Sequence, residues 1–242
     1  MRRRKQRSSL GLWISVIVIA LLIVGGLFFW KIYSVKNSAE FNPSTISIYF
    51  FINSSKFGND ESDNLGSSNL NNIGYFIIVD GSKRSVYITR VKDHSYNSQT
   101  KQQIDFSNPK LSESLLADML GIKAIYDYYV VFNHEKFNEF ASSLGINASN
   151  FEDLFDKLSQ RGLKVLDYLK LDGVVKKLRP ETSLTSEGLA KLIYSFGTYS
   201  VRMLDLPTMT ENPLEIKVLN KTIHRLYIDL EKLNQMKEEI RR

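Results

Sequence analysis

Residues 121–146 read GIKAIYDYYVVFNHEKFNEFASSLGI, and this stretch decides the fold class. It opens with a glycine, a residue that commonly ends a helix, and continues with the aromatic and β-branched run Ile125 to Phe132, which predicts a strand. After a polar corner, apolar residues recur at helical spacing, at Phe137, Phe140 and Leu144. The stretch therefore predicts a strand that leads directly into a helix, a unit that any α/β core can contain.

The chain before this stretch contains further strand patterns. Residues 46–52, ISIYFFI, form an apolar run of strand length, and two β-rich runs at 73–80 and 84–91 flank an Asp-Gly turn and predict a hairpin. Pro109 suits the first turn of a helix that Gly121 ends, because the N–H that proline lacks would be unpaired there.

Two helical patterns follow the central stretch. Residues 150–179 carry leucine and phenylalanine at helical spacing. In the next pattern Thr185 or Ser186 can cap the start of a helix, and Gly197 is expected to end it.

The last part of the chain allows two interpretations. Residues 200–207 predict a strand, and residues 214–228 fit two strands with a turn at Asn220-Lys221. A heptad spacing that continues to Leu233 would suit one long helix equally well. In either case strands alternate with helices, which predicts one α/β domain over residues 45–242, a three-layer type of sandwich with a mixed central sheet flanked by helices.

A transmembrane helix is expected to precede this domain. Residues 10–30 are an uncharged apolar run of 21 residues. At 1.5 Å per residue this run covers roughly 30 Å, the thickness of a hydrocarbon core. The run is longer than the apolar region of a cleaved signal peptide, and it lacks the polar stripe of a core helix. Residues 1–9 then form a basic tail and residues 31–44 a linker.

Charge predicts the orientation of this helix. Five arginines and lysines precede the span, whereas only Lys31 and Lys36 follow it closely. Because positive residues stay on the cytoplasmic side, the N-terminus is expected in the cytoplasm and the bulk of the chain outside the cell membrane.

Composition excludes several functions. The formal net charge is +6, and removing the five N-terminal positive residues leaves +1, so the high isoelectric point describes the anchor and gives no sign of nucleic-acid binding. The chain has no cysteine, which excludes disulfides, thiolate metal sites and cysteine nucleophiles. Its 3 histidines are scattered without metal-ligand spacing.

A polar segment at residues 53–72 interrupts the strand patterns. Asn, Ser, Asp and Gly dominate it, so it cannot bury enough apolar surface to order itself, and we expect a mobile loop. Asp60, Glu61 and Asp63 could bind a metal ion, although a solvated acidic loop is the more common meaning of such a group.

Residues 115–146 and the hairpin IGYFIIVDGSKRSVYITRVKD at 73–93 resemble the LytR-CpsA-Psr family of cell-envelope proteins. That family has a helix ending in Leu-Gly-Ile, a strand with Asp-Tyr-Tyr-Val, an asparagine corner and a second helix. The same order occurs here at Leu120, Asp127 and Asn133. The likeness in topology extends over residues 46–235.

This resemblance implies a short cytoplasmic tail, one span and an extracytoplasmic domain that moves glycopolymers from a polyprenyl diphosphate carrier to peptidoglycan. Such a site requires guanidinium groups, whose planar forks bind phosphate oxygens in pairs. It also requires carboxylates that hold a divalent cation such as Mg²⁺, and an apolar groove for the lipid.

The chain departs from the family pattern at these charges. An Arg-x-Asp motif of the family falls at residues 70–72, which here are Leu-Asn-Asn. The Arg-Asp motif after the hairpin matches Lys92-Asp93, the candidate catalytic residues. The candidate ligand-binding residues are the nearby arginines Arg90, Arg161 and Arg179. Strand alternation could direct Arg90 away from Lys92.

Three hypotheses follow from these matches and departures. The first is a divergent family member of cell-envelope biogenesis that has lost most of the catalytic charges and that would need Mg²⁺ if it still catalyses transfer. The second is a non-catalytic binding or scaffolding module that holds a lipid-linked glycan or a partner protein. The third is an anchored α/β domain whose likeness to the family is accidental.

Overall fold

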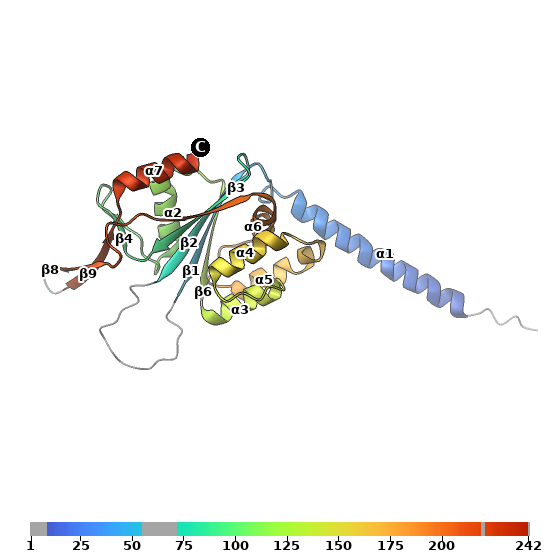
Figure 1. Ribbon diagram of the computed structural model, residues 1–242. Helices are drawn as coiled ribbons and strands as arrows, with labels where there is room; N and C mark the ends of the chain where they lie inside the picture. The colour runs from blue at the N-terminus through green and yellow to red at the C-terminus, as the bar shows by residue number, and fades with distance from the viewer. Residues whose placement is uncertain (1–8, 55–71, 219–220, 242) are drawn as a thin grey trace, which may run out of the picture.

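The computed structural model describes residues 9–54, 72–218 and 221–241. Most of the expected loop at 53–72, nearly all of the basic tail and Asn220 therefore lie outside the described residues. The rest forms an α/β domain with one long helix extending from it (Figure 1).

A five-stranded sheet forms the centre of the domain. Its order is β6-β1-β2-β3-β7. The strands are β1 (Ile46–Asn53), β2 (Ile73–Asp80), β3 (Ser85–Lys92), β6 (Tyr126–Phe132) and β7 (Ser200–Asp205). β1 pairs parallel with β6, β3 pairs parallel with β7, and β2 runs antiparallel between β1 and β3. The predicted mixed sheet and the 73–91 hairpin are confirmed.

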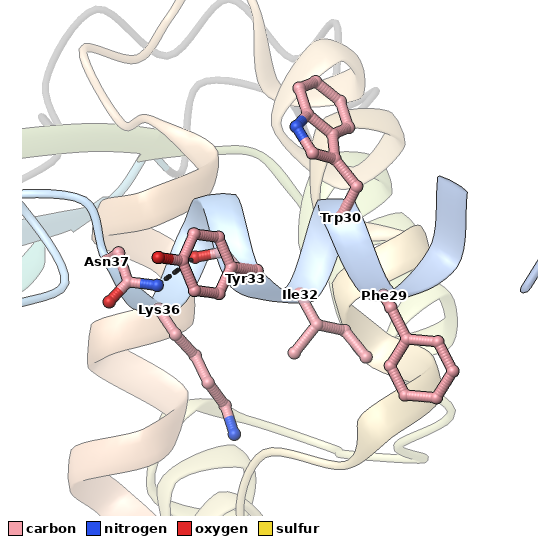
Figure 2. A pocket seen from close by; sticks show the side chains of 6 residues that line it. All are labelled: Phe29, Trp30, Ile32, Tyr33, Lys36 and Asn37. Atoms are coloured by element: carbon pink, nitrogen blue, oxygen red, sulfur yellow. Dashed lines mark hydrogen bonds between the residues drawn. The ribbon is translucent and has the colours of Figure 1, made fainter. Parts of the chain in front are cut away.

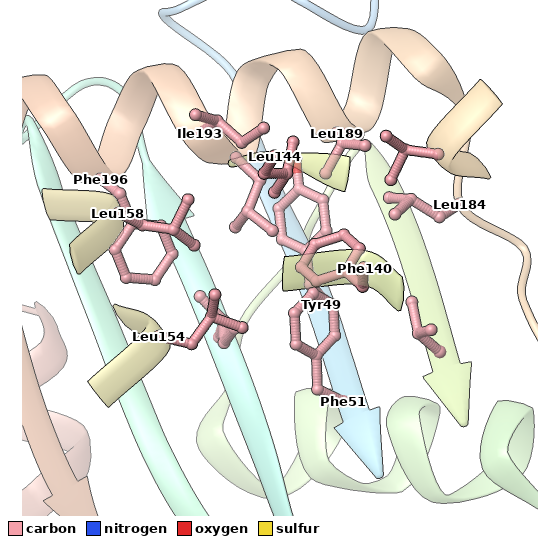
Figure 3. Close-up of a cluster of buried hydrophobic side chains, with 14 of the residues drawn as sticks. Tyr49, Phe51, Phe140, Leu144, Leu154, Leu158, Leu184, Leu189, Ile193 and Phe196 are labelled. Atoms are coloured by element: carbon pink, nitrogen blue, oxygen red, sulfur yellow. The ribbon is translucent and has the colours of Figure 1, made fainter. Parts of the chain in front are cut away.

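One face of this sheet is covered by four helices: α3 (His134–Ser143), α4 (Phe151–Arg161), α5 (Leu171–Leu178) and α6 (Ser186–Thr198). Their apolar residues and the sheet form a closely packed cluster (Figure 3). Phe51 lies at its centre, with ring centroids of Phe132 at 5.2 Å and Phe140 at 6.3 Å. The helical spacing in residues 134–161 and 186–196 therefore buries the expected side chains, whereas Leu166 and Leu169 of the 150–179 pattern are exposed.

The opposite face is covered by α2 (Pro109–Leu120) and α7 (Leu230–Arg241) (Figure 1). Phe50 is fully buried there and packs edge-on against Phe106 at 5.5 Å. Helices on both faces confirm the three-layer sandwich.

A second sheet, of order β5-β4-β9-β8, extends from one end of the domain. It consists of β4 (Ser95–Asn97), β5 (Gln102–Gln103), β8 (Leu214–Val218) and β9 (Lys221–Tyr227). The interpretation of residues 223–233 as one helix is wrong, because residues 221–227 form β9, which pairs with both β8 and β4. The last helix begins only after Asp229, whose Oδ1 accepts a hydrogen bond from the Lys232 N–H at 3.2 Å.

Local signals explain most helix ends. Asn108 caps α2 by accepting from the Leu111 N–H, and Gly121 ends it at a φ of 69°. Thr185 caps α6, and α6 ends at Thr198, one residue after Gly197. A Cβ at Gly197 would lie 2.3 Å from the Cα of Gly162, so this glycine serves the close approach of α6 to the end of α4.

The long helix α1 (Ser9–Lys36) is the one helix within the described residues that is long and apolar enough to cross a membrane. It continues six residues past Trp30, so the first part of the expected linker is helical. That extension packs on the domain: Val35 is buried, and Lys31 Nζ lies 2.7 Å from Asp172 Oδ2.

Candidate functional site

One edge of the central sheet gathers the carboxyl ends of four strands. β1, β3, β6 and β7 all run in the same direction and end there at Asn53, Lys92, Phe132 and Asp205. In open α/β sheets ligands bind outside the carboxyl ends of the strands. A ligand-binding site is therefore expected at this edge of the sheet.

Arg90 is the central cation of this edge. Its Nε and Nη2 donate to the two oxygens of Asp205 at 2.6 and 2.9 Å, which raises the pKa of Arg90. Its Nη1 lies 3.7 Å from Oε1 of Glu152, in the first turn of α4. The side chain is 41% exposed, so one corner of the guanidinium remains accessible to a ligand.

Tyr75 lies beside Arg90 on the neighbouring strand and shares its partner. The two residues are paired in the β2–β3 register, and the Tyr75 hydroxyl donates to Glu152 Oε1 at 2.8 Å. Burial, and then the Glu152 carboxylate, raise the pKa of Tyr75 well above its usual value, so this hydroxyl stays protonated. Arg90, Asp205, Glu152 and Tyr75 form one network, the Arg90 cluster.

A small cavity adjoins the Arg90 cluster through Tyr75. Its volume is about 150 Å³. It is lined by Asn53, Tyr75, His134, Phe137, Ser149, Asn150 and Phe151. The lining combines three aromatic rings with amide, hydroxyl and imidazole groups, a mixture typical of small ligand sites.

Lys92 and Asp93 point to opposite faces of the sheet. Lys92 shares the face of Arg90, because residues two apart in a strand lie on one side, so the expectation that alternation separates them is wrong. Lys92 Nζ donates to the carbonyl of Glu211 at 2.8 Å. Asp93 is buried on the other face and accepts from the His94 N–H and, at 3.1 Å, from the Phe106 N–H. Burial raises the pKa of Asp93.

Arg161 and Arg179 lie away from the Arg90 cluster. Arg161 ends α4, nine residues and roughly 14 Å along the helix from Glu152. Its fork donates to both oxygens of buried Asp167, at 2.8 and 2.7 Å. Exposed Arg179 follows α5 near β6, three strand positions and roughly 14 Å across the sheet from β3. The structure therefore brings only Arg90 and Lys92 of the candidate residues to one surface.

Sequence reasoning missed Tyr75, Glu152 and Asp205. The strand pattern placed Tyr75 and Asp205 in strands, but no local signal shows which residues face one another across the sheet. Glu152 follows the Asn150 cap of α4 and was indistinguishable from a helix-start carboxylate.

Within the residues that the structure describes, no three His, Asp or Glu side chains are grouped so that they could hold a metal ion. Asp205 is engaged by Arg90, and Asp93 faces the interior. The carboxylates nearest to Arg90 are those of Glu152 and Asp205, so Mg²⁺ binding stays a prediction from the resemblance. Asp60, Glu61 and Asp63 lie outside the described residues.

Comparison with known proteins identifies the fold. No protein-family model and no curated protein matches the sequence. Among solved structures, Lin1025 of Listeria innocua matches 82% of this chain and 97% of its own, with a TM-score of 0.52 and 10% identity. Lmo1026 of Listeria monocytogenes matches 85% of this chain and 98% of its own, with a TM-score of 0.51 and 12% identity. TagV of Bacillus subtilis matches 81% of this chain and 97% of its own, with a TM-score of 0.50 and 11% identity. TagV and Lmo1026 are LytR-CPS2A-Psr proteins, and this chain has the fold of that family.

Proposed function

We propose that this protein is anchored in the cell membrane by α1 and binds the diphosphate headgroup of a polyprenyl-linked glycan at the Arg90 cluster. In this proposal the protein holds the lipid-linked glycan for cell-envelope assembly. Peptidoglycan would be the acceptor if the protein also catalysed transfer. The fold supports the class of protein, and the motifs at residues 73–146 support the class of ligand.

The position of Arg90 carries the proposal. Its guanidinium stands at the carboxyl edge of four parallel strands, and its Nη1 lies 3.7 Å from Glu152, beyond hydrogen-bonding distance. The N–H groups of Nη1 can therefore donate to a phosphate oxygen while Asp205 keeps its bidentate contact. The adjoining cavity offers aromatic and amide groups to a sugar or phosphate.

The same geometry favours binding over transfer. Asp205 and Glu152 place two carboxylates beside the one accessible guanidinium. These two negative charges offset much of the positive charge of Arg90, which would otherwise stabilise the charge that develops when a diphosphate bond breaks.

The proposed topology has residues 1–9 in the cytoplasm and the α/β domain outside. Charge before and after the span supports this orientation. A reporter that is active only outside the cytoplasm, fused after residue 40, should be active. Cytoplasmic activity of the fusion would reverse the topology.

The binding test uses the full chain in lipid nanodiscs and a fluorescent polyprenyl diphosphate sugar. We expect saturable binding that Arg90→Gln weakens about tenfold to a hundredfold, because a hydrogen bond to a charged group contributes about 1.5–3 kcal/mol. Arg202→Gln is the matched control, since Arg202 lies on adjacent β7 and pairs with Glu239 of α7 on the other face. Equal binding by wild type and Arg90→Gln would remove the site assignment, and magnesium-dependent turnover would establish transferase activity.

A further inference from the structure

We propose that the turn η2 (Val165–Leu169) and the adjoining end of α1 form a membrane-contact surface that holds the domain against anionic lipid headgroups. This inference rests on the proposed role of α1 as the membrane anchor. It adds a second contact between the domain and the bilayer, through a segment that belongs neither to the Arg90 cluster nor to its cavity.

The contacts of α1 set the height of η2 above the membrane when the domain is docked. Lys31 Nζ lies 2.7 Å from Asp172 Oδ2, just after η2, and Lys36 Nζ lies 5.9 Å from the ring centre of Tyr168, within η2. Val35 is fully buried between these two contacts. Residues 165–172 therefore lie alongside residues 31–36 of α1.

This height matches the headgroup layer. The apolar run ends at Trp30, and residues 31–36 rise from about 2 to 9 Å beyond it. The polar layer of a bilayer is roughly 5–8 Å thick on each side. The segment that contains η2 is therefore level with the headgroups when α1 spans the membrane.

The exposed side chains of η2 are apolar. Val165, Leu166 and Leu169 are 59%, 66% and 54% exposed, whereas Asp167 and Tyr168 between them are buried. A five-residue turn that presents three large aliphatic side chains outward is poorly suited to water but suited to the boundary between headgroups and acyl chains.

Basic residues flank these apolar side chains. Lys164 and Lys170 are exposed on either side of η2, and Lys36 lies over the Tyr168 ring. Lysines beside an apolar tip are attracted to an anionic surface, each contributing about a fivefold change in the equilibrium. The positive charge of these lysines favours an anionic lipid surface as the binding partner. The same surface on a second copy of the chain would carry the same lysines and would repel them.

An aromatic groove lies at the same height on α1. Phe29, Trp30, Ile32, Tyr33, Lys36 and Asn37 line a shallow groove of about 580 Å³ (Figure 2). Tryptophan and tyrosine favour the membrane interface, because an apolar ring and a polar group are both accommodated there. The groove and η2 thus both lie near the membrane-proximal end of the domain, where α1 leaves the apolar run.

The test uses depth-dependent quenching. Since the chain has no cysteine, single cysteines can be introduced and labelled with a fluorophore in the full chain. The sites are Leu166→Cys in η2, Ile19→Cys within α1, and Leu111→Cys, an exposed position on α2 as the control. The protein is reconstituted in nanodiscs containing anionic lipid, with nitroxides at the headgroup and along the acyl chain.

We expect quenching at positions 166 and 19 and none at 111. Lys164→Gln combined with Lys170→Gln should lower the ratio of docked to undocked domain about 25-fold in anionic nanodiscs. Quenching at 19 without quenching at 166 overturns this inference and leaves the anchor intact, whereas no quenching at 19 overturns the anchor itself. Unchanged quenching at 166 in the double lysine variant overturns the assignment to anionic headgroups.

Discussion

Replacing Asp205 with asparagine should tighten the binding of a polyprenyl diphosphate. Asp205 occupies two N–H groups of Arg90, at 2.6 and 2.9 Å, and its negative charge would lie about 5 Å from a phosphate bound to the same guanidinium. Both side chains are well exposed, so a dielectric constant close to that of water applies, and the repulsion is about 1 kcal/mol. Asp205→Asn should therefore lower the Kd about fivefold.

The variant should remain folded, because an exposed ion pair contributes about 0–1 kcal/mol to stability. Its binding is measured in nanodiscs by titration with the fluorescent lipid-linked sugar, first at low salt and then at about 1 M salt, where the gain should largely disappear. Asp127→Asn is the control, since Asp127 forms a comparably exposed pair with Lys110 at 2.5 Å.

The opposite result would refute the reasoning. If Asp205→Asn weakens binding, Asp205 contacts the ligand or a cation that bridges to it, and it is not a competitor for Arg90. A gain that persists unchanged at high salt would show that the released hydrogen-bond donors matter more than the removed charge.

Three further predictions concern buried groups and helix packing. Burial raises the pKa of Glu113 to about 8 in the folded state, above its unfolded value, so the stability of the wild type falls as the pH rises toward 8. Glu113→Gln should lack this loss. Measured by urea titration, its unfolding free energy should therefore rise by about 2–3 kcal/mol relative to wild type between pH 6 and pH 9. Burial lowers the pKa of Lys191 to about 8, so stability should rise between pH 8 and pH 10 in wild type, and Lys191→Met, compared by the same titration, should lack this rise. In thermal melts, Gly197→Ala should lower stability by about 1–3 kcal/mol, because its Cβ would lie 2.3 Å from the Cα of Gly162. Gly173→Ala is the control, since Gly173 has open space around it, and it should be neutral or stabilising. Equal losses in the two variants would contradict the packing argument.

Local chemistry made much of the fold predictable. The strand at 126–132, the asparagine cap before α3 and the left-handed Gly121 each depend on a few neighbouring residues. The short strands β4 and β5, of 3 and 2 residues, carry too little pattern to be recognised in a sequence. The extension of α1 beyond Trp30 could not be predicted from the sequence, because tertiary contacts of Val35 and Lys31 with the domain stabilise it.

The candidate site was only partly predictable for the same reason. Lys92 belongs to the segment that matches a family motif and Arg90 lies two residues before it, but their partners come from distant segments. Asp205 reaches Arg90 because β7 pairs parallel with β3, and Glu152 reaches it because α4 packs over that end of the sheet. Such pairings depend on long-range register, which has no local sequence signal, so the charge balance of the site appears only in the folded chain.

The relative positions of anchor and site set a requirement on the ligand. Residues 37–45 connect α1 to the first residue of β1, and the Arg90 cluster lies at the edge where β1 ends, eight residues and roughly 26 Å along the strand. If η2 holds the domain against the headgroups, tilting cannot close this distance, because a tilt would lift Leu166 and Leu169 out of the interface. A diphosphate at Arg90 must then remain joined to the bilayer by a lipid chain that crosses or follows the domain. A long polyprenyl carrier satisfies this geometry, and a short prenyl chain does not, so the separation between anchor and cluster itself favours long-chain carriers.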